Sequence, residues 1–163
     1  MIYGYARISS PRQNIESQIR NIKGAYPEAV VIQEVFTGSN YKDRKRLKGI
    51  VRRVKADDTI VFDSVSRMSR NAKEGFELYE ELFNCGIHLV FLKEPHINTD
   101  TYKKAMGNQL NMTGDAVDLI LEGINRYLLE LAKSQIRLAF EQAEKEVSDL
   151  RQRTKEGIET ARL

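Results

Sequence analysis

The stretch Ile2-Tyr3-Gly4-Tyr5-Ala6-Arg7-Ile8-Ser9 decides the fold that this sequence predicts. Its apolar and aromatic residues alternate in the manner of a β-strand. Side chains two positions apart leave the same face of a strand, so Arg7 and Ser9 share a face. We therefore expect the chain to open with a strand whose end carries a guanidinium beside a hydroxyl.

Outward from this strand, three more short apolar runs predict strands, and helical patterns separate them. The expected strands are Val30 to Phe36, Thr59 to Phe62 and Ile87 to Leu92, and the expected helices cover about Gln13 to Gly24, Asp43 to Lys55 and Ala72 to Cys85. Gly86 stands where a left-handed helix cap belongs. This alternation predicts an α/β fold of three αβα layers around a mostly parallel sheet, whose ligands bind beyond the carboxyl ends of the strands.

The pattern changes after Pro95. Residues 96 to 114 are polar and irregular, Ala116 to Leu131 looks helical, and a long helix is expected from about Ser134 to the end. We expect a first domain in residues 1 to 133, with 96 to 133 as an extended, insertion-like stretch, and a long dimerising helix in 134 to 163.

Small and apolar residues recur along that last helix at alternating spacings of four and three, which is typical of a coiled-coil seam. They are Ile136, Phe140, Ala143, Val147, Leu150, Thr154, Gly157 and Ala161. A helix of about 30 residues would span roughly 45 Å and outreach a small domain. We expect it to project and meet a partner helix, and the alternative is that the seam packs on its own domain.

Positive charge is concentrated in one segment of the 163-residue chain, whose net charge is only +3. Residues 42 to 55 have a net charge of +7, which leaves −4 for the rest. The basic residues are Lys42, Arg44, Lys45, Arg46, Lys48, Arg52, Arg53 and Lys55, against Asp43 alone. Such a concentration suits contact with DNA, although a solvated helix face is the alternative.

Several other classes of protein find no support in the sequence. Cys85 is the only cysteine, so an intrachain disulfide is impossible. The only histidines are His88 and His96, and together with Cys85 they form no metal-binding motif of recognisable spacing. The carboxylates between residues 115 and 122 are interpreted as solvated. No apolar run could cross a bilayer and no signal peptide is recognisable, so a cytoplasmic protein without metal or membrane contact is expected.

A second constellation follows the third strand, in Asp63-Ser64-Val65-Ser66-Arg67-Met68-Ser69-Arg70-Asn71. Arg67 and Arg70 share a helical face. A serine hydroxyl is a weak nucleophile, which a strongly positive setting can activate, and Arg forks bind phosphate oxygens in pairs. Three such forks, with Arg7 as the third, could surround a phosphate near Ser9.

Several motifs, in order, resemble the resolvase and invertase family of serine recombinases. They are Tyr5-Ala6-Arg7-Ile8-Ser9, Gln13 and Gln18, Thr37-Gly38 with Asp43-Arg44-Lys45, Ser66-Arg67-x-x-Arg70 and, near the end, Arg151-Gln152-Arg153-Thr154-Lys155-Glu156-Gly157. The resemblance implies that Ser9 is the nucleophile. It also implies the other site residues: Arg7, Arg67 and Arg70 around the phosphate, Gln13, Gln18, Arg44 and Ser66 as support, and Arg53, Arg151, Arg153 and Lys155 on DNA.

The resemblance implies a mechanism and its partners. Dimers would pair as a tetramer on double-stranded DNA, and each Ser9 would join a 5′ phosphate before strands are exchanged and rejoined. No cofactor and no small-molecule substrate are expected, because the serine ester stores the bond energy. Members generally continue into a separate DNA-binding domain, which we expect to be absent from this chain. A mobile-element enzyme is expected, with the type of recombination left open.

Two departures and three alternatives remain. Most relatives have Asp where this chain has Ser66, so the acid that protonates the leaving oxygen could be an arginine, water or Asp63. The stretch from His96 to about Leu138 is longer than in a small resolvase. The protein could instead be a non-catalytic α/β phosphate-binding module or a dimerisation module, or Tyr3 or Tyr5 could be the nucleophile.

Overall fold

The computed structural model describes residues 1–9, 15–35, 44–107 and 110–162, with the backbone alone for 147–151 and 159–162. Four parallel strands form one sheet in the order β2-β1-β3-β4. They are β1 (Ile2–Ile8), β2 (Val30–Val35), β3 (Thr59–Phe62) and β4 (His88–Phe91). Tyr5 lies opposite Ile32 on one side and Phe62 on the other. The parallel sheet predicted from the sequence is confirmed.

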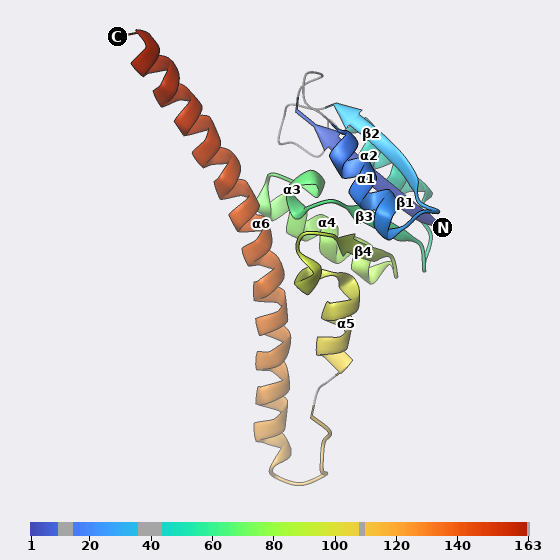
Figure 1. The fold of residues 1–163 in the computed structure, drawn as a ribbon. Coiled ribbons are helices and arrows are strands. Elements are labelled where there is room, and N and C mark those ends of the chain that lie inside the picture. Colours follow the sequence, from blue (N-terminus) through green and yellow to red (C-terminus); the bar gives the residue numbers. More distant parts are fainter. Residues whose placement is uncertain (10–14, 36–43, 108–109, 163) are drawn as a thin grey trace.

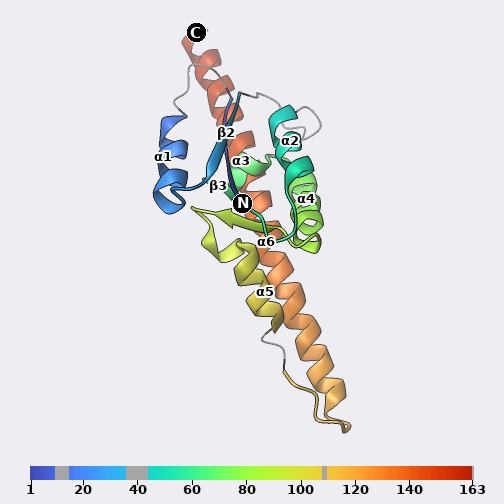
Figure 2. The ribbon, with the colours of Figure 1, turned by 90° about the vertical axis from the view of Figure 1, so that its right-hand side faces the viewer.

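Helices cover both faces of this sheet, which confirms the three layers (Figure 2). α1 (Glu16–Ala25) lies on one face, where Ile22 packs with Ala29 and Val61. On the other face lie α2 (Lys45–Arg53), the single turn α3 (Val65–Met68) and α4 (Ala72–Asn84). Gly86, directly after α4, has the expected positive φ of 79°.

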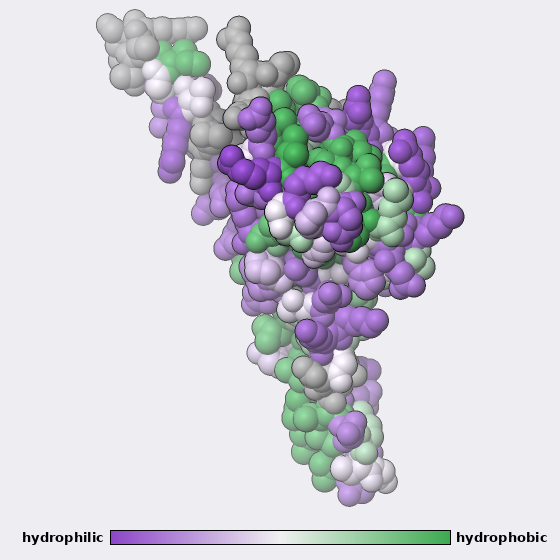
Figure 3. Space-filling view, turned by 45° about the vertical axis from the view of Figure 1, so that its right-hand side comes forward, coloured by the Kyte–Doolittle hydropathy of each residue, from purple (hydrophilic) through white to green (hydrophobic). Residues whose placement is uncertain are grey.

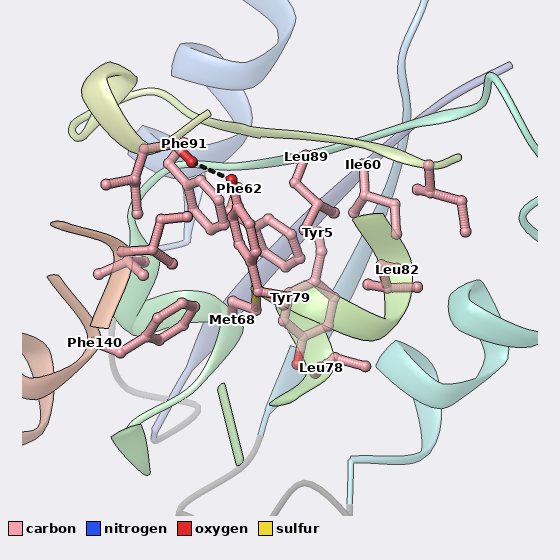
Figure 4. Close-up of a cluster of buried hydrophobic side chains, with 14 of the residues drawn as sticks. Tyr5, Ile60, Phe62, Met68, Leu78, Tyr79, Leu82, Leu89, Phe91 and Phe140 are labelled. Carbon is pink, nitrogen blue, oxygen red and sulfur yellow. Dashed lines mark hydrogen bonds between the residues drawn. The ribbon is translucent and has the colours of Figure 1, made fainter. Parts of the chain in front are cut away.

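An aromatic cluster fills the core between the sheet and α4 (Figure 4). The rings of Phe62 and Phe91 stack at 5.4 Å between centroids, and Tyr79 of α4 stacks on Phe91 at 6.1 Å. Phe140 enters from the C-terminal helix and meets both Tyr79 and Phe91 edge-on. The core therefore joins this helix to the sheet.

The part after β4 differs from the expectation in two ways. Residues that looked irregular form a short 3-10 helix η2 (Pro95–Ile97) and α5 (Thr99–Gly107), and the two expected helices are one, α6 (Asp118–Arg162), of 45 residues. The expected break before Ser134 contains no Gly or Pro, and the Ser134 hydroxyl donates to the Glu130 carbonyl within the helix. The boundary placed between residues 133 and 134 therefore falls inside α6.

The expected seam of α6 is divided between two environments. Ile136, Phe140 and Ala143 are buried in the protein's own core, as the alternative for this seam supposed. Thr154 and Gly157 are exposed on the half of α6 that projects past the sheet (Figure 1). The remaining seam side chains, those of Val147, Leu150 and Ala161, lie outside the described residues.

Candidate active site

The carboxyl end of β1 is fixed by α1. The side chain of the buried Gln18 accepts a hydrogen bond from the Arg7 backbone N–H at 3.0 Å and donates one to the Arg7 carbonyl at 2.8 Å. Both backbone groups of Arg7 are thus held by one amide. The position of the Arg7 and Ser9 side chains is therefore set by the packing of α1 as well as by the sheet.

Arg7 and Arg67 connect this strand end to α3. The fully buried Arg7 guanidinium donates to the Ser66 carbonyl at 2.8 Å and to the Arg67 carbonyl at 3.4 Å. In return, Nη1 of Arg67 donates to the Arg7 carbonyl at 3.1 Å. The two arginines predicted from separate motifs are thus brought side by side.

Ser9 meets Arg70 directly. Nη2 of Arg70 donates to the Ser9 hydroxyl oxygen at 2.6 Å. A hydrogen bond from a charged donor favours negative charge on the accepting oxygen, so this contact favours the alkoxide form of Ser9. The structure places nucleophile candidate and guanidinium together, as the spacing of the motifs predicted.

Arg44 binds the backbone carbonyls at the end of α3. It is buried just before α2, and its Nη1 donates to the carbonyls of Arg67 (3.2 Å) and Met68. Carbonyls at the end of a helical turn lack partners within the turn, and a cation there is favourable. Arg44 therefore holds the segment that carries Arg67 and Arg70.

The charges of the neighbouring guanidinium groups act on Arg7. Burial, and then the charges of Arg44, Arg70 and Arg67, lower the pKa of Arg7 to about 9. Burial also lowers the pKa of Arg44 and of Arg67. At Arg67, the charge of Asp63 partly offsets this effect. A cluster of like charges suits a site that binds an anion, since a bound phosphate would relieve the repulsion.

Comparison with known proteins gives a family for this site. The family model described as "Resolvase, N terminal domain" matches residues 2–126. The chain belongs to the resolvase family. It is similar to the transposon Tn917 resolvase of Enterococcus faecalis, at 32% identity over 101 residues, 62% of this chain and 52% of that protein. It is also similar to the transposon Tn501 resolvase of Pseudomonas aeruginosa, at 30% identity over 171 residues, 98% of this chain and 87% of that one.

This resolvase-family chain is also similar to solved structures. The N-terminal catalytic domain of TP901-1 integrase has a TM-score of 0.49 and 21% identity, covering 80% of this chain and 97% of that one. A resolvase family site-specific recombinase from Streptococcus pneumoniae has a TM-score of 0.45 and 18% identity, covering 99% and 98%.

Sequence reasoning did not identify Tyr5 and Glu34 as supporting residues of the resolvase-family site. The Tyr5 hydroxyl donates to Glu34 at 2.6 Å, and the other Glu34 oxygen accepts from the Arg46 backbone N–H at 2.8 Å. Burial, and then Glu34, raise the pKa of Tyr5 well above its usual range. Tyr5 and Tyr3 are both buried, which disfavours either as a nucleophile. The sequence signal that could have identified Glu34 was the presence of a carboxylate within the mainly apolar strand β2.

Ser66 and Asp63 differ in the partners of their side chains, which bears on whether either could protonate the leaving oxygen. The Ser66 hydroxyl is half-buried and lies 2.8 Å from the Ser64 hydroxyl. The buried Asp63 accepts from Asn21 at 2.9 Å through one oxygen and pairs with Lys93 at 3.2 Å through the other. Both oxygens of Asp63 are engaged, which disfavours Asp63 as the acid for a leaving oxygen.

The remaining predicted residues are exposed or lie outside the described residues. Arg53 on α2 and Arg153 and Lys155 on the projecting half of α6 are exposed. Gln13 and the side chain of Arg151 lie outside the described residues. Within the described part of the chain, no group of three or more His, Cys, Asp or Glu could hold a metal ion, and no helix is long and apolar enough to cross a membrane.

Proposed function

We propose that this resolvase-family protein is a site-specific DNA recombinase of a mobile genetic element and that Ser9 is its nucleophile. The observation that carries the proposal is the contact of Arg70 with the Ser9 hydroxyl at 2.6 Å, beside the linked Arg7 and Arg67. The family supports recombination as the activity. The names of the similar transposon resolvases support a mobile element as its setting.

The chemistry is a transesterification. The Ser9 oxygen forms a bond to a backbone phosphorus, the bond from that phosphorus to the 3′ oxygen breaks, and the Ser9 proton is lost while the 3′ oxygen gains one. Negative charge grows on the phosphate oxygens in the transition state, where fixed guanidinium groups stabilise it most. The 5′-phosphoserine ester keeps the bond energy, so attack by a 3′ hydroxyl of the exchanged strand rejoins DNA without a nucleotide cofactor.

Double-stranded DNA is the proposed partner, in the cytoplasm. Each chain carries one Ser9, so cutting both strands of two duplexes needs four copies, which we propose assemble as two dimers. Exposed Arg53, Arg153 and Lys155 would bind backbone phosphates. Residues 1–133 and 134–163 are proposed as the catalytic and DNA-contacting parts, with α6 continuous across that boundary.

The test uses supercoiled plasmid DNA that carries the cognate recombination site. The full-length protein should leave DNA covalently linked through its 5′ end, and Ser9→Ala should leave none. The neighbouring Ser10→Ala protein is the matched control and should still form the linked species. Linked DNA with Ser9→Ala would contradict the assignment of the nucleophile.

The second candidate is a non-catalytic module that binds phosphate or dimerises. The arginine cluster, in which Arg7 and Arg44 are buried, is also what a static anion site would show. A dimerisation module predicts that Arg67→Ala leaves its function intact, and a static anion site predicts that no protein-linked DNA end forms. The recombinase predicts the linked end and a near-complete loss of cleavage in Arg67→Ala, because the phosphate charge is no longer compensated.

A further inference from the structure

A polar pocket of about 360 Å³ lies between α3, the segment after β4 and α6. Its lining is mainly polar and charged, in contrast to the N-terminal half of α6, where apolar side chains gather (Figure 3). Of the candidate active-site residues that the structure describes, Ser66 and Arg67 line this pocket, whereas Ser9 and Arg70 do not. Glu94 belongs to the same lining. The pocket therefore adjoins the arginine cluster at Ser66 and Arg67.

The leaving 3′ oxygen needs a proton donor that lies apart from Ser9. In an in-line displacement at phosphorus, the attacking and leaving oxygens lie on opposite sides of the phosphate. Arg70 is bonded to the Ser9 hydroxyl, so it belongs to the attacking side. Ser66 lies between the arginine cluster and the pocket, because its carbonyl accepts from Arg7 at 2.8 Å and the residue lines the pocket. Its hydroxyl therefore offers a donor on the pocket side of the cluster.

A second hydroxyl and a carboxyl lie next to Ser66. The Ser64 and Ser66 hydroxyl oxygens are 2.8 Å apart, so either hydroxyl can donate to the other. A serine alone is a poor acid, because it needs another group to replace the proton that it gives away. Oε2 of Glu94 accepts from the Val65 backbone N–H at 3.0 Å, and Val65 stands between the two serines in the chain. This bond fixes the Glu94 carboxyl beside the pair of hydroxyls.

The surroundings of the half-buried Glu94 help its carboxyl to keep a proton. Burial raises the pKa of Glu94, while the Val65 N–H and the charges of His96 and Lys93 partly offset this effect, and the charge of Glu146 adds to it. A carboxyl whose pKa lies closer to the working pH is more often protonated and is a better proton donor at that pH. Glu94 is thus a carboxyl beside the site that can supply a proton.

We propose that Glu94 supplies the proton that the leaving 3′ oxygen gains, through the hydroxyls of Ser64 and Ser66. As the bond from phosphorus to the 3′ oxygen breaks, the Ser66 proton moves to that oxygen. The Ser64 proton replaces it, and the Glu94 proton moves across the pocket to Ser64, which leaves a carboxylate. Rejoining reverses each transfer, so Glu94 then accepts the proton of the attacking 3′ hydroxyl. The proposal rests on the proposed function and names its proton source.

The test compares two DNA substrates that differ in the leaving atom. One has the ordinary 3′ oxygen at the cleavage position, and the other has a bridging 3′ sulfur, which leaves as a thiolate without a proton because a thiol has an ordinary pKa of about 8.5. The measurement is the rate at which the full-length protein forms 5′-linked DNA. Glu94→Gln keeps an oxygen that can accept from Val65, but it has no proton to supply. It should slow cleavage of the oxygen substrate about 100-fold and of the sulfur substrate less than about 3-fold.

The matched control is Glu146→Gln, which removes a carboxylate from the exposed α6 side of the same pocket. It should change either rate by less than about 3-fold, because water screens an exposed charge. Adding Ser66→Asp to Glu94→Gln should restore cleavage of the oxygen substrate, because a carboxyl then replaces the hydroxyl that faces the leaving oxygen.

The outcomes separate this proposal from the nucleophile assignment. Ser9→Ala should abolish cleavage of both substrates, and if it does not, the nucleophile assignment fails while the ratio of the two rates in Glu94→Gln still measures the proton source. Glu94→Gln that slows both substrates equally would show that Glu94 only holds α3 in place. That result, or an unchanged rate on the oxygen substrate, would overturn the proposal.

Discussion

The buried guanidinium of Arg7 makes the stability of the protein depend on pH. Its pKa of about 9 lies well below the ordinary value for arginine, so above about pH 9 the unfolded chain binds more protons than the folded one until arginine itself loses its proton. This group therefore makes the folded state more stable as pH rises through that window, and its charge costs stability at neutral pH. A bound anion favours the charged form and raises the pKa again.

We predict that sulfate stabilises the DNA-free protein in a pH-dependent way. At equal ionic strength, sulfate should raise the melting temperature above its value in chloride at pH 7, and this gain should shrink towards pH 10 as Arg7 loses its proton. The control Arg7→Met, similar in length without charge, should show a smaller gain and no step near pH 9. A gain that grows with pH would contradict this account of Arg7.

Tyr5→Phe tests the missed contact with Glu34. The change removes a buried hydrogen bond and should lower the free energy of unfolding by about 1–3 kcal/mol, measured by urea denaturation. Tyr127→Phe, at a 65% exposed tyrosine, is the control and should change it by less than about 0.5 kcal/mol. Equal effects would mean that the Tyr5–Glu34 bond contributes nothing.

At this scale, the sequence predicted the charged centre and two of its supporting residues, Gln18 and Arg44, and missed Glu34. Arg7, Ser9, Arg67 and Arg70 follow strand ends, and parallel strands bring such ends to one edge of the sheet. Glu34 carries no motif, and its bond to Tyr5 depends on a strand register that the sequence leaves open. Ser66 was recognisable as a departure, but its hydroxyl contact with Ser64 was not.

At the scale of elements, the approach of α6 to α4 depends on Gly75. A Cβ added there would lie 2.5 Å from Cδ1 of Phe140 and 2.9 Å from Cβ of Ser69. Ser69 directly precedes Arg70, and Phe140 is part of the aromatic core. Close packing at this point therefore connects α6 to the segment that carries the candidate active site.

Gly75→Ala should lower the free energy of unfolding by about 1–3 kcal/mol, because overpacking a core contact outweighs the gain in helix propensity. Gly49→Ala is the control, since it is also helical and a Cβ there meets only the end of the Arg53 side chain at 3.9 Å. It should raise stability by up to about 1 kcal/mol. Urea denaturation measures both, and a stabilised Gly75→Ala would contradict the contact.

The strands and the three main helices of the sheet domain could be predicted, because their apolar periodicity is strong. α5 could not, since only Thr99 and Tyr102 of its nine residues are buried, which leaves little periodicity. The length of α6 was missed because the helical pattern was divided into two helices, Ala116 to Leu131 and about Ser134 to the end, which the structure shows as one. The exposed Ile120 and Tyr127 looked like an ordinary helix face until the structure showed which face was covered.

At the scale of the molecule, the exposed basic residues on the projecting half of α6 should act together on DNA. Arg153→Ala with Lys155→Ala should weaken binding to all DNA sequences and reduce the slope of log affinity against log salt by about two. Lys103→Ala with Lys104→Ala removes the same charge from α5, which lies away from the C-terminal end of α6 (Figure 1), and should change the slope little. Equal slopes for both pairs would contradict a DNA contact at Arg153 and Lys155.

The central claim is that the Ser9 hydroxyl, among its arginines, becomes bonded to a DNA phosphate. The most direct measurement is the chemical identity of that bond in trapped protein–DNA complexes, by mild alkali and by mass spectrometry of the linked peptide. The account predicts that alkali releases the DNA by elimination and that the nucleotide mass lies on the peptide at Ser9. A link that survives alkali and maps to Tyr3 or Tyr5 would contradict it.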